Sequence, residues 1–140
     1  MTESITTKGI HHLGLTVPNV NETRRFFVDV LDYEFLGERT DYPAAFVTDG
    51  VTMITLWQTT DPDTAVPFNR KNVVGLHHLA LAVDNHQGLD AIFERLRVAE
   101  NVSIEFPPEA RGDKGARHLM CNIPGGIRVE FFSPGASTES

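Results

Sequence analysis

Two short segments of the chain alternate between apolar and other residues in the same way. Residues 9–17 read GIHHLGLTV and residues 75–83 read GLHHLALAV, and six of the nine positions are identical. Successive side chains of a strand point to opposite faces. Each segment is therefore predicted to be a strand whose leucine and valine side chains form one apolar face, packed under a helix.

The opposite face of each predicted strand holds one histidine followed by small residues. Its members are Gly14, Thr16 and His12 in the first segment, and Ala80, Ala82 and His78 in the second. Small side chains leave space beside an imidazole, so these faces predict a cavity that contains His12 and His78, with His11 and His77 pointing the other way. Two core histidines bonded to backbone carbonyls are the alternative. The equivalence of the two positions favours a metal-binding or catalytic role.

Apolar residues at helical spacing follow each of the two segments. Leu89, Ile92, Phe93 and Leu96 form one stripe of an amphipathic helix. The corresponding stretch of the first half has two phenylalanines at similar spacing, and Asn21 is predicted to cap the start of that helix. Three strand-like runs then follow in each half. They cover residues 33–38, 44–48 and 51–58 in the first half, and 102–106, 117–123 and 127–133 in the second.

The order of these elements predicts an α+β fold made of two βαβββ modules. The whole chain, 1–140, would form a single domain, with the first module at 9–58 and the second at 75–133. Residues 59–74 are polar and contain proline, which is typical of a linker. Two copies are too few for a solenoid, so a duplicated unit is the better interpretation.

Glu130 is the candidate carboxylate for the same cavity as the two histidines. It lies in the middle of a predicted apolar strand, where a charge is costly unless it is paired or bound to a metal. An ion pair with Arg128 or a lysine on an exposed face is the alternative. Two histidines and one glutamate form a facial triad, which suits Fe²⁺ or Mn²⁺ and leaves coordination positions for a substrate.

Five further residues are candidates for the predicted cavity. His118 precedes Glu130 by one strand and could act as a catalytic acid or base, although a surface histidine is an equal alternative. Thr55 occupies the position that the repeat matches to Glu130. The expected pocket residues are Thr55, Trp57, Met53 and Met120; Trp57 and Met53 could equally be plain core residues.

Charge and composition narrow the choice of partners. The formal net charge of −7 argues against nucleic acid, because surfaces that bind phosphate backbones are usually basic. No apolar run approaches the roughly 20 residues of a membrane span, and no signal peptide is recognisable. The single cysteine, Cys121, fits a reducing compartment. We therefore expect a cytoplasmic protein whose partner is a small-molecule substrate.

Four motifs together resemble the vicinal oxygen chelate superfamily, which includes glyoxalase I, extradiol dioxygenases and bleomycin-resistance proteins. They are HLGLTV, HLALAV, FFVDVLDYEFLGE and PGGIRVEFF, and the resemblance covers roughly residues 9–133. It implies two βαβββ modules forming curved mixed sheets around a divalent metal, with His12, His78 and Glu130 as ligands. The fourth position of the glyoxalase I pattern falls on Thr55, a poor ligand, which disfavours that enzyme.

Three functions remain open for a chain with this resemblance. The ligand set is similar to that of ring-cleaving, extradiol-type dioxygenases, which makes this chemistry the first choice, with Fe²⁺ or Mn²⁺. A glyoxalase-I-like lyase or isomerase, with Ni²⁺, Co²⁺ or Zn²⁺, is the second. A metal-free protein that sequesters a drug is the third. We expect a homodimer, because the edge strands of incomplete barrels need partners.

Overall fold

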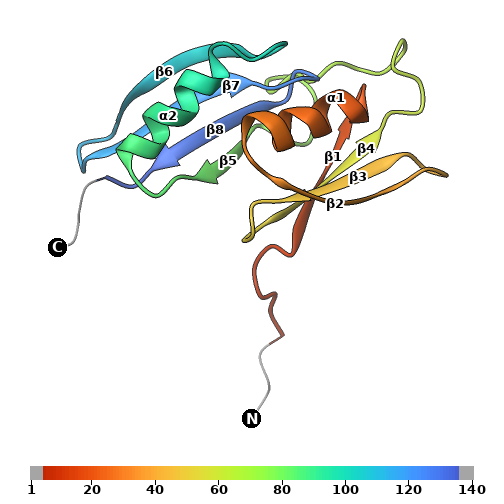
Figure 1. The fold of residues 1–140 in the computed structure, drawn as a ribbon, viewed down its shortest axis with the longest axis horizontal. Coiled ribbons are helices and arrows are strands. Elements are labelled where there is room, and N and C mark those ends of the chain that lie inside the picture. Colours follow the sequence, from red (N-terminus) through yellow and green to blue (C-terminus); the bar gives the residue numbers. More distant parts are fainter. Residues whose placement is uncertain (1–4, 136–140) are drawn as a thin grey trace. The chain divides into compact units, whose positions relative to one another are not determined.

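The computed structural model describes residues 5–135 of the 140-residue chain. By its internal contacts the chain divides into two compact units, one up to Ala65 and the other from Val66 onward (Figure 1). Each unit contains one four-stranded sheet and its own helical segment. The predicted α+β fold of two βαβββ modules is confirmed.

In the first unit the sheet has the order β1-β4-β3-β2, with β1 parallel to β4 and the other pairs antiparallel. A helical segment connects β1 to β2, and its second half is π-helical. The elements are β1 (His12–Val17), α1 (Val20–Arg25), η1 (Phe26–Val30), β2 (Glu34–Arg39), β3 (Ala44–Thr48) and β4 (Met53–Gln58).

The second unit repeats this topology, with the order β5-β8-β7-β6 and a parallel β5–β8 pair. Its helix contacts β6, β7 and β8. The elements are β5 (Leu79–Ala82), α2 (His86–Leu96), β6 (Ser103–Arg111), β7 (Ala116–Asn122) and β8 (Arg128–Ser133).

Two asparagines 66 residues apart start the two helices. The side chain of Asn19 accepts a hydrogen bond from the backbone N–H of Glu22 at 3.1 Å, and that of Asn85 accepts from Gly88 at 2.8 Å. Both caps satisfy a backbone donor that the helix itself leaves open. The prediction that Asn21 is the cap was wrong: Asn21 is already inside the helix, and the extended residue before it is Asn19.

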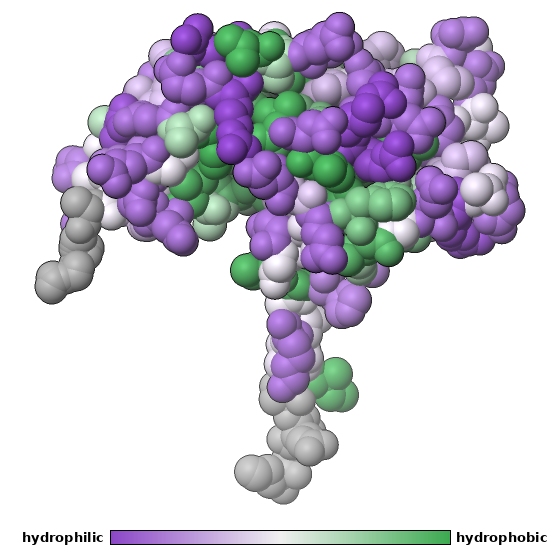
Figure 2. Space-filling model, viewed as in Figure 1, coloured by the Kyte–Doolittle hydropathy of each residue, from purple (hydrophilic) through white to green (hydrophobic). Residues whose placement is uncertain are grey.

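One face of each sheet forms the core beneath the helix. In the second unit Leu119, Val129 and Phe131 are buried there together with Leu89 and Leu96 of the amphipathic helix. Around α2 the surface is mostly hydrophilic (Figure 2), because this helix turns its charged side chains outward. Each sheet therefore has one covered face and one open face, and the candidate site residues lie on the open faces.

Cys121 is buried on the covered face of its sheet, as expected from the sequence. Burial raises the pKa of its thiol to about 12, because the thiolate would lose its hydration. The thiol is therefore protonated at neutral pH and is not a reactive nucleophile.

Strand register defines which positions of the two sheets are equivalent. Gly14 of β1 pairs with Thr55 of β4, and Ala80 of β5 pairs with Glu130 of β8. Gly14 and Ala80 are 66 residues apart, so Thr55 and Glu130 occupy the same place in the two sheets. Within residues 5–135 no helix is long and apolar enough to cross a membrane.

Candidate functional site

The open face of the second sheet combines polar residues with small ones. β8 contributes Glu130 and Arg128, β7 contributes His118 and Met120, and β5 contributes Ala80. This face is opposite to the one that carries Val129 and Phe131, because neighbouring residues of a strand alternate. The small side chain beside Glu130 leaves the carboxylate accessible to the histidine that precedes β5.

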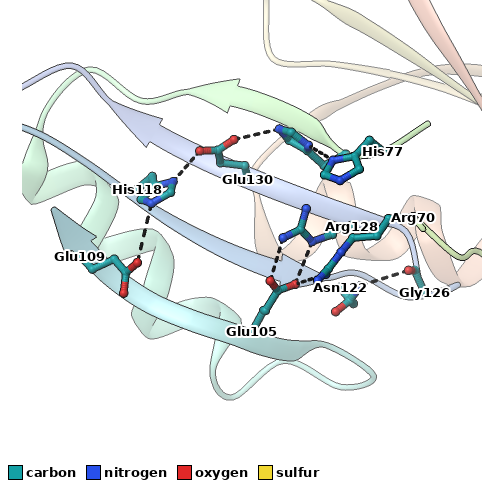
Figure 3. Close-up of polar contacts among 10 residues, drawn as sticks. Arg70, His77, Glu105, Glu109, His118, Asn122, Gly126, Arg128 and Glu130 are labelled. Carbon is teal, nitrogen blue, oxygen red and sulfur yellow. Dashed lines mark hydrogen bonds and ion pairs between the residues drawn. The ribbon is translucent and has the colours of Figure 1, made fainter. Parts of the chain in front are cut away.

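Glu130 is the centre of a short chain of hydrogen bonds (Figure 3). Its carboxylate is close to two imidazoles: Oε2 lies 2.6 Å from Nδ1 of His118, and Oε1 lies 3.1 Å from Nε2 of His78. The residue is only 7% exposed, so these contacts replace the water that the carboxylate would otherwise bind. Arg128, the alternative partner, pairs with Glu105 instead.

His118 is held on both sides by aromatic rings and is largely buried. Its ring centroid lies 4.8 Å from that of Phe106 and 6.5 Å from that of Phe132. An ionised carboxylate can only accept, so the 2.6 Å contact to Glu130 requires the proton of His118 to be on Nδ1. Nε2 is then free to accept a proton, since the nearest carboxylate oxygen, on Glu109, is 3.9 Å away.

His78 is the more exposed member of the chain, with a side chain 33% accessible. It precedes β5, and its Nδ1 lies 2.8 Å from Nδ1 of His77. The same contact joins His11 and His12 at 2.9 Å. The prediction that the two histidines of each pair point in opposite directions was therefore wrong. Strict alternation applies only inside the strand, and β5 begins at Leu79.

The equivalent face of the first sheet is occupied by neutral groups. Thr55 is 3% exposed; its hydroxyl accepts a hydrogen bond from Nε1 of Trp57 at 2.9 Å and donates to the carbonyl of Leu13 at 3.4 Å. Trp57 packs against Tyr42, with ring centroids 4.9 Å apart. A Cβ on Gly14 would lie 3.1 Å from the threonine hydroxyl, so glycine permits this close approach.

The sequence-predicted residues are distributed over both units. The second unit brings together Glu130, His78 and His118, with Met120 directly opposite Glu130 on the next strand. The first unit brings together Thr55 and Trp57, and places Met53 on the same face. His12 starts β1 of the first unit, is exposed, and pairs in register with Met53.

Sequence reasoning missed an ion-pair cluster beside this chain. Both oxygens of Glu105 accept from Arg128, at 2.8 and 2.7 Å, and Arg70 adds a third contact at 3.0 Å. The hydrogen bonds from Arg128, helped by the charges of Arg128 and Arg70, hold the pKa of the Glu105 carboxyl below its usual range. The signal was Arg128 itself, a buried-strand arginine without an assigned acid.

Two of the predicted metal ligands have suitable chemistry and spacing. Two ligands each about 2.1 Å from a metal and at right angles lie about 3.0 Å apart. Nε2 of His78 and Oε1 of Glu130 are 3.1 Å apart, so the pair fits two adjacent positions of such a site. Among residues 5–135 there is no group of three histidine, cysteine, aspartate or glutamate side chains that could hold an ion.

Comparisons with known proteins give one family and a set of similar folds. The Glyoxalase/Bleomycin resistance protein/Dioxygenase superfamily matches residues 9–131. A 2-epi-5-epi-valiolone epimerase from Actinomyces sp is 27% identical over 146 residues, covering 89% of this chain and 78% of the relative.

Two solved structures illustrate the likeness in fold. A glyoxylase/bleomycin resistance protein/dioxygenase domain from Frankia sp. EAN1pec has a TM-score of 0.82 and 24% identity, covering 95% of this chain and 96% of that one. A variant of the fosfomycin resistance protein FosX from Listeria monocytogenes, complexed with Mn(II) and 1S,2S-dihydroxypropylphosphonic acid, has a TM-score of 0.73 and 16% identity, covering 94% and 95%.

Proposed function

Since the chain belongs to the Glyoxalase/Bleomycin resistance protein/Dioxygenase superfamily, we propose that it is a metal-dependent isomerase or epimerase. Its reaction would move a proton on a carbon next to a carbonyl, in a small substrate with oxygens on neighbouring carbons. The observation that carries the proposal is the 2.6 Å bond from His118 to Glu130, which leaves Nε2 of the histidine as a base. The 27% identity to an epimerase supports the same reaction class.

His118 is the residue to which we assign proton transfer. Glu130 fixes its tautomer and orientation through Oε2, and the Phe106 ring limits rotation of the imidazole. A carboxylate in this place also stabilises the imidazolium that forms when Nε2 takes a proton. The largely buried setting keeps bulk water from competing for that proton.

The other oxygen of Glu130 and the ring of His78 are the proposed metal ligands, with His12 as the third. The support for His12 is its equivalence to His78 in the repeat and its exposure on the open face of the first sheet. A bound divalent cation would act as a Lewis acid toward the oxygens of the substrate. Mn²⁺ is the first candidate, because the donors are nitrogen and oxygen and the FosX variant contains it.

Neutral residues are the proposed walls of the substrate pocket. Met120 lies opposite Glu130 in the register, and Thr55, Trp57 and Met53 line the open face of the first sheet. The hydroxyl of Thr55 is committed to Trp57 and Leu13, so we do not assign it a metal. Ring-cleaving dioxygenase chemistry, the first choice from the sequence, becomes the second here, because it gives Nε2 of His118 no necessary role.

The experiment follows hydrogen exchange at the carbon next to a carbonyl. Protein loaded with Mn²⁺ is incubated in D₂O with dihydroxyacetone and a panel of larger α-hydroxy ketones, and deuterium incorporation is measured by NMR. We expect His118→Gln to reduce exchange by about 100-fold or more while Mn²⁺ affinity stays within about threefold. His86→Gln is the matched control, because His86 bonds Ser133 and the Gly115 carbonyl and takes no part in the chain around Glu130.

Three outcomes would contradict this assignment. Exchange that persists in His118→Gln would remove the histidine from proton transfer. Consumption of O₂ with a catechol and the Fe²⁺-loaded protein would favour ring cleavage. Ligand binding with neither exchange nor metal uptake would favour a sequestering protein of the drug-resistance kind.

We also propose a homodimer, and a pair of variants tests whether its sites are shared. His12→Ala and Glu130→Ala each remove one proposed ligand, one from each unit. If His12 comes from the neighbouring subunit, a mixed dimer of the two variants has one complete site and recovers Mn²⁺ binding. If each chain builds its own site, subunit exchange leaves Mn²⁺ binding absent. Size-exclusion chromatography of a monomer would contradict the dimer itself.

A further inference from the structure

The second unit contains a basic pocket beside the chain of hydrogen bonds around Glu130. Its volume is about 340 Å³, and it is lined by Arg70 and Lys71 of the segment before β5, by Arg128 of β8 and by Asn122 of β7. Three of these four side chains are cationic. In a protein with a formal net charge of −7 such a grouping is not the background of the surface.

A single carboxylate balances the cations of this pocket only in part. Glu105 accepts from Nε and Nη2 of Arg128 and from Nη1 of Arg70. The remaining N–H groups of the two guanidinium ions are then available to the pocket. Lys71 has no ion-pair partner within residues 5–135. Glu130 also acts electrostatically on Arg128, but its own carboxylate is held by two histidines.

The cationic groups are held in place before any ligand arrives. Arg128 is 8% exposed and bound at two points, so its guanidinium is fixed in orientation. The loop that carries Arg70 and Lys71 is closed by Asn69, whose side-chain oxygen accepts from the backbone of Lys71 at 2.9 Å and of Asn72 at 3.2 Å. A preorganised site loses less entropy when it binds.

We propose that this pocket binds a dianionic phosphoryl group, as in a phosphate ester or a phosphonate. Three cations against one internal carboxylate leave an excess of two positive charges, which a phosphoryl group of nearly −2 matches and a carboxylate of −1 does not. Guanidinium forks also match the geometry of phosphoryl oxygens.

The same geometry names the substrate class for the proposed reaction, and this part rests on the proposed function. Arg128 and Glu130 are two residues apart on one face of β8, so their Cα atoms are about 6.6 Å apart. A small substrate of three to six carbons spans that distance. Its phosphoryl end would bind in the basic pocket while its neighbouring oxygens face Glu130 and His78.

The test titrates metal-free protein with inorganic phosphate at pH 7.5 and constant ionic strength, and follows backbone and Asn122 side-chain amides by NMR. We expect saturable binding in the low millimolar range or tighter, with the largest shifts in residues 69–72 and 122–128. Arg70→Gln and Lys71→Gln should each weaken binding by about three- to tenfold, the loss of one charge-assisted contact. Lys114→Gln is the matched control, because it removes the same charge from an exposed loop outside the pocket.

Further arms separate this inference from its alternatives. Acetate should bind about tenfold more weakly than phosphate; equal affinity would overturn the dianionic assignment. Absence of saturation by 50 mM, roughly the upper limit for a specific site, or equal weakening by Lys114→Gln, would overturn the site. Glu130→Gln should leave phosphate affinity within about twofold. Phosphate binding is measured without metal or turnover, so failure of the proposed reaction would not imitate failure of this site.

Discussion

Gly14 pairs with Thr55 in the first sheet, and Ala80 pairs with Glu130 in the second. The registers extend this equivalence along both sheets. Met53 corresponds to Arg128, because each precedes its reference position by two residues on the same face. The other equivalent pairs are Trp57 and Phe132, Phe46 and Met120, Ala44 and His118, and Thr48 and Asn122.

The difference between the two open faces is one of charge and not of backbone. The first face carries a methionine, a threonine and a tryptophan where the second carries Arg128, Glu130 and a phenylalanine. A buried charge needs partners, and the second unit supplies them from β6 and β7: Glu105 for the arginine and His118 for the glutamate. At nine residues, β6 is longer than the six-residue β2. A duplicated scaffold thus accepts reactive groups only where neighbouring strands also change.

The largest effect should come from removing the carboxylate of the second face. Glu130→Gln keeps the shape of the side chain but takes away its charge, so we expect Mn²⁺ affinity to fall by at least about 100-fold. Thr55→Val at the equivalent position should leave Mn²⁺ affinity within about twofold. Calorimetric titration of both variants measures the difference. Equal losses would mean that the two faces contribute alike and that the asymmetry is not functional.

A second effect concerns the stability of the buried ion pair. Arg128→Met inserts the residue that the first sheet has at this place, and leaves Glu105 with Arg70 alone. Breaking a buried pair typically costs 3–5 kcal/mol, and the partial exposure of Glu105 reduces this to about 2 kcal/mol. Urea unfolding measures the loss. The double variant Arg128→Met with Glu105→Leu should recover part of it, and no recovery would mean that the arginine acts through packing.

A third effect tests the neutral network of the first face. Thr55→Val removes the acceptor for the indole N–H of Trp57, which should cost about 1 kcal/mol of unfolding free energy. Trp57 is the single tryptophan of the chain, so its fluorescence reports the change directly. Thr48→Val, on the neighbouring strand, is the matched control. An unchanged emission spectrum and an unchanged midpoint would show that the hydroxyl is replaceable by water.

The smallest effect is a pH dependence of stability. The hydrogen bonds from Arg128 lower the pKa of Glu105 in the folded state, so its contribution is complete above the unfolded pKa of about 4.3. The contribution is lost as pH falls below that value through the folded pKa. Glu105→Gln should therefore lose less stability than the wild type between about pH 5 and pH 3. Parallel curves for the two proteins would exclude this linkage.

Much of the fold could be predicted because its signals are local. Alternation marks β1 and β5 in the repeated nonapeptide, and the 66-residue spacing also relates Asn19 to Asn85, the two helix caps. The sequence interpretation nevertheless placed the first cap at Asn21. Several residues near a helix start can bond to a backbone N–H, and only the backbone conformation of Asn19 shows which one does.

The candidate site could be predicted only in part. Alternation selected Glu130 and the face on which it lies, and the repeat matched it to Thr55. The register with β7, however, is what brings His118 within 2.6 Å of the carboxylate. Glu105 was missed because β6 has register shifts on both sides of Phe106, and a shift changes which face a residue occupies.

The sequence by itself determined the duplicated βαβββ plan, the faces of its first strands and the residue types that could carry chemistry. These follow from periodicities of two and about 3.6 residues, which depend on the backbone alone. The tertiary structure decided which charged groups meet: Glu130 with two histidines, and Arg128 with Glu105. Strand order, register and bulges set those partners, because they bring together residues that are distant in the chain.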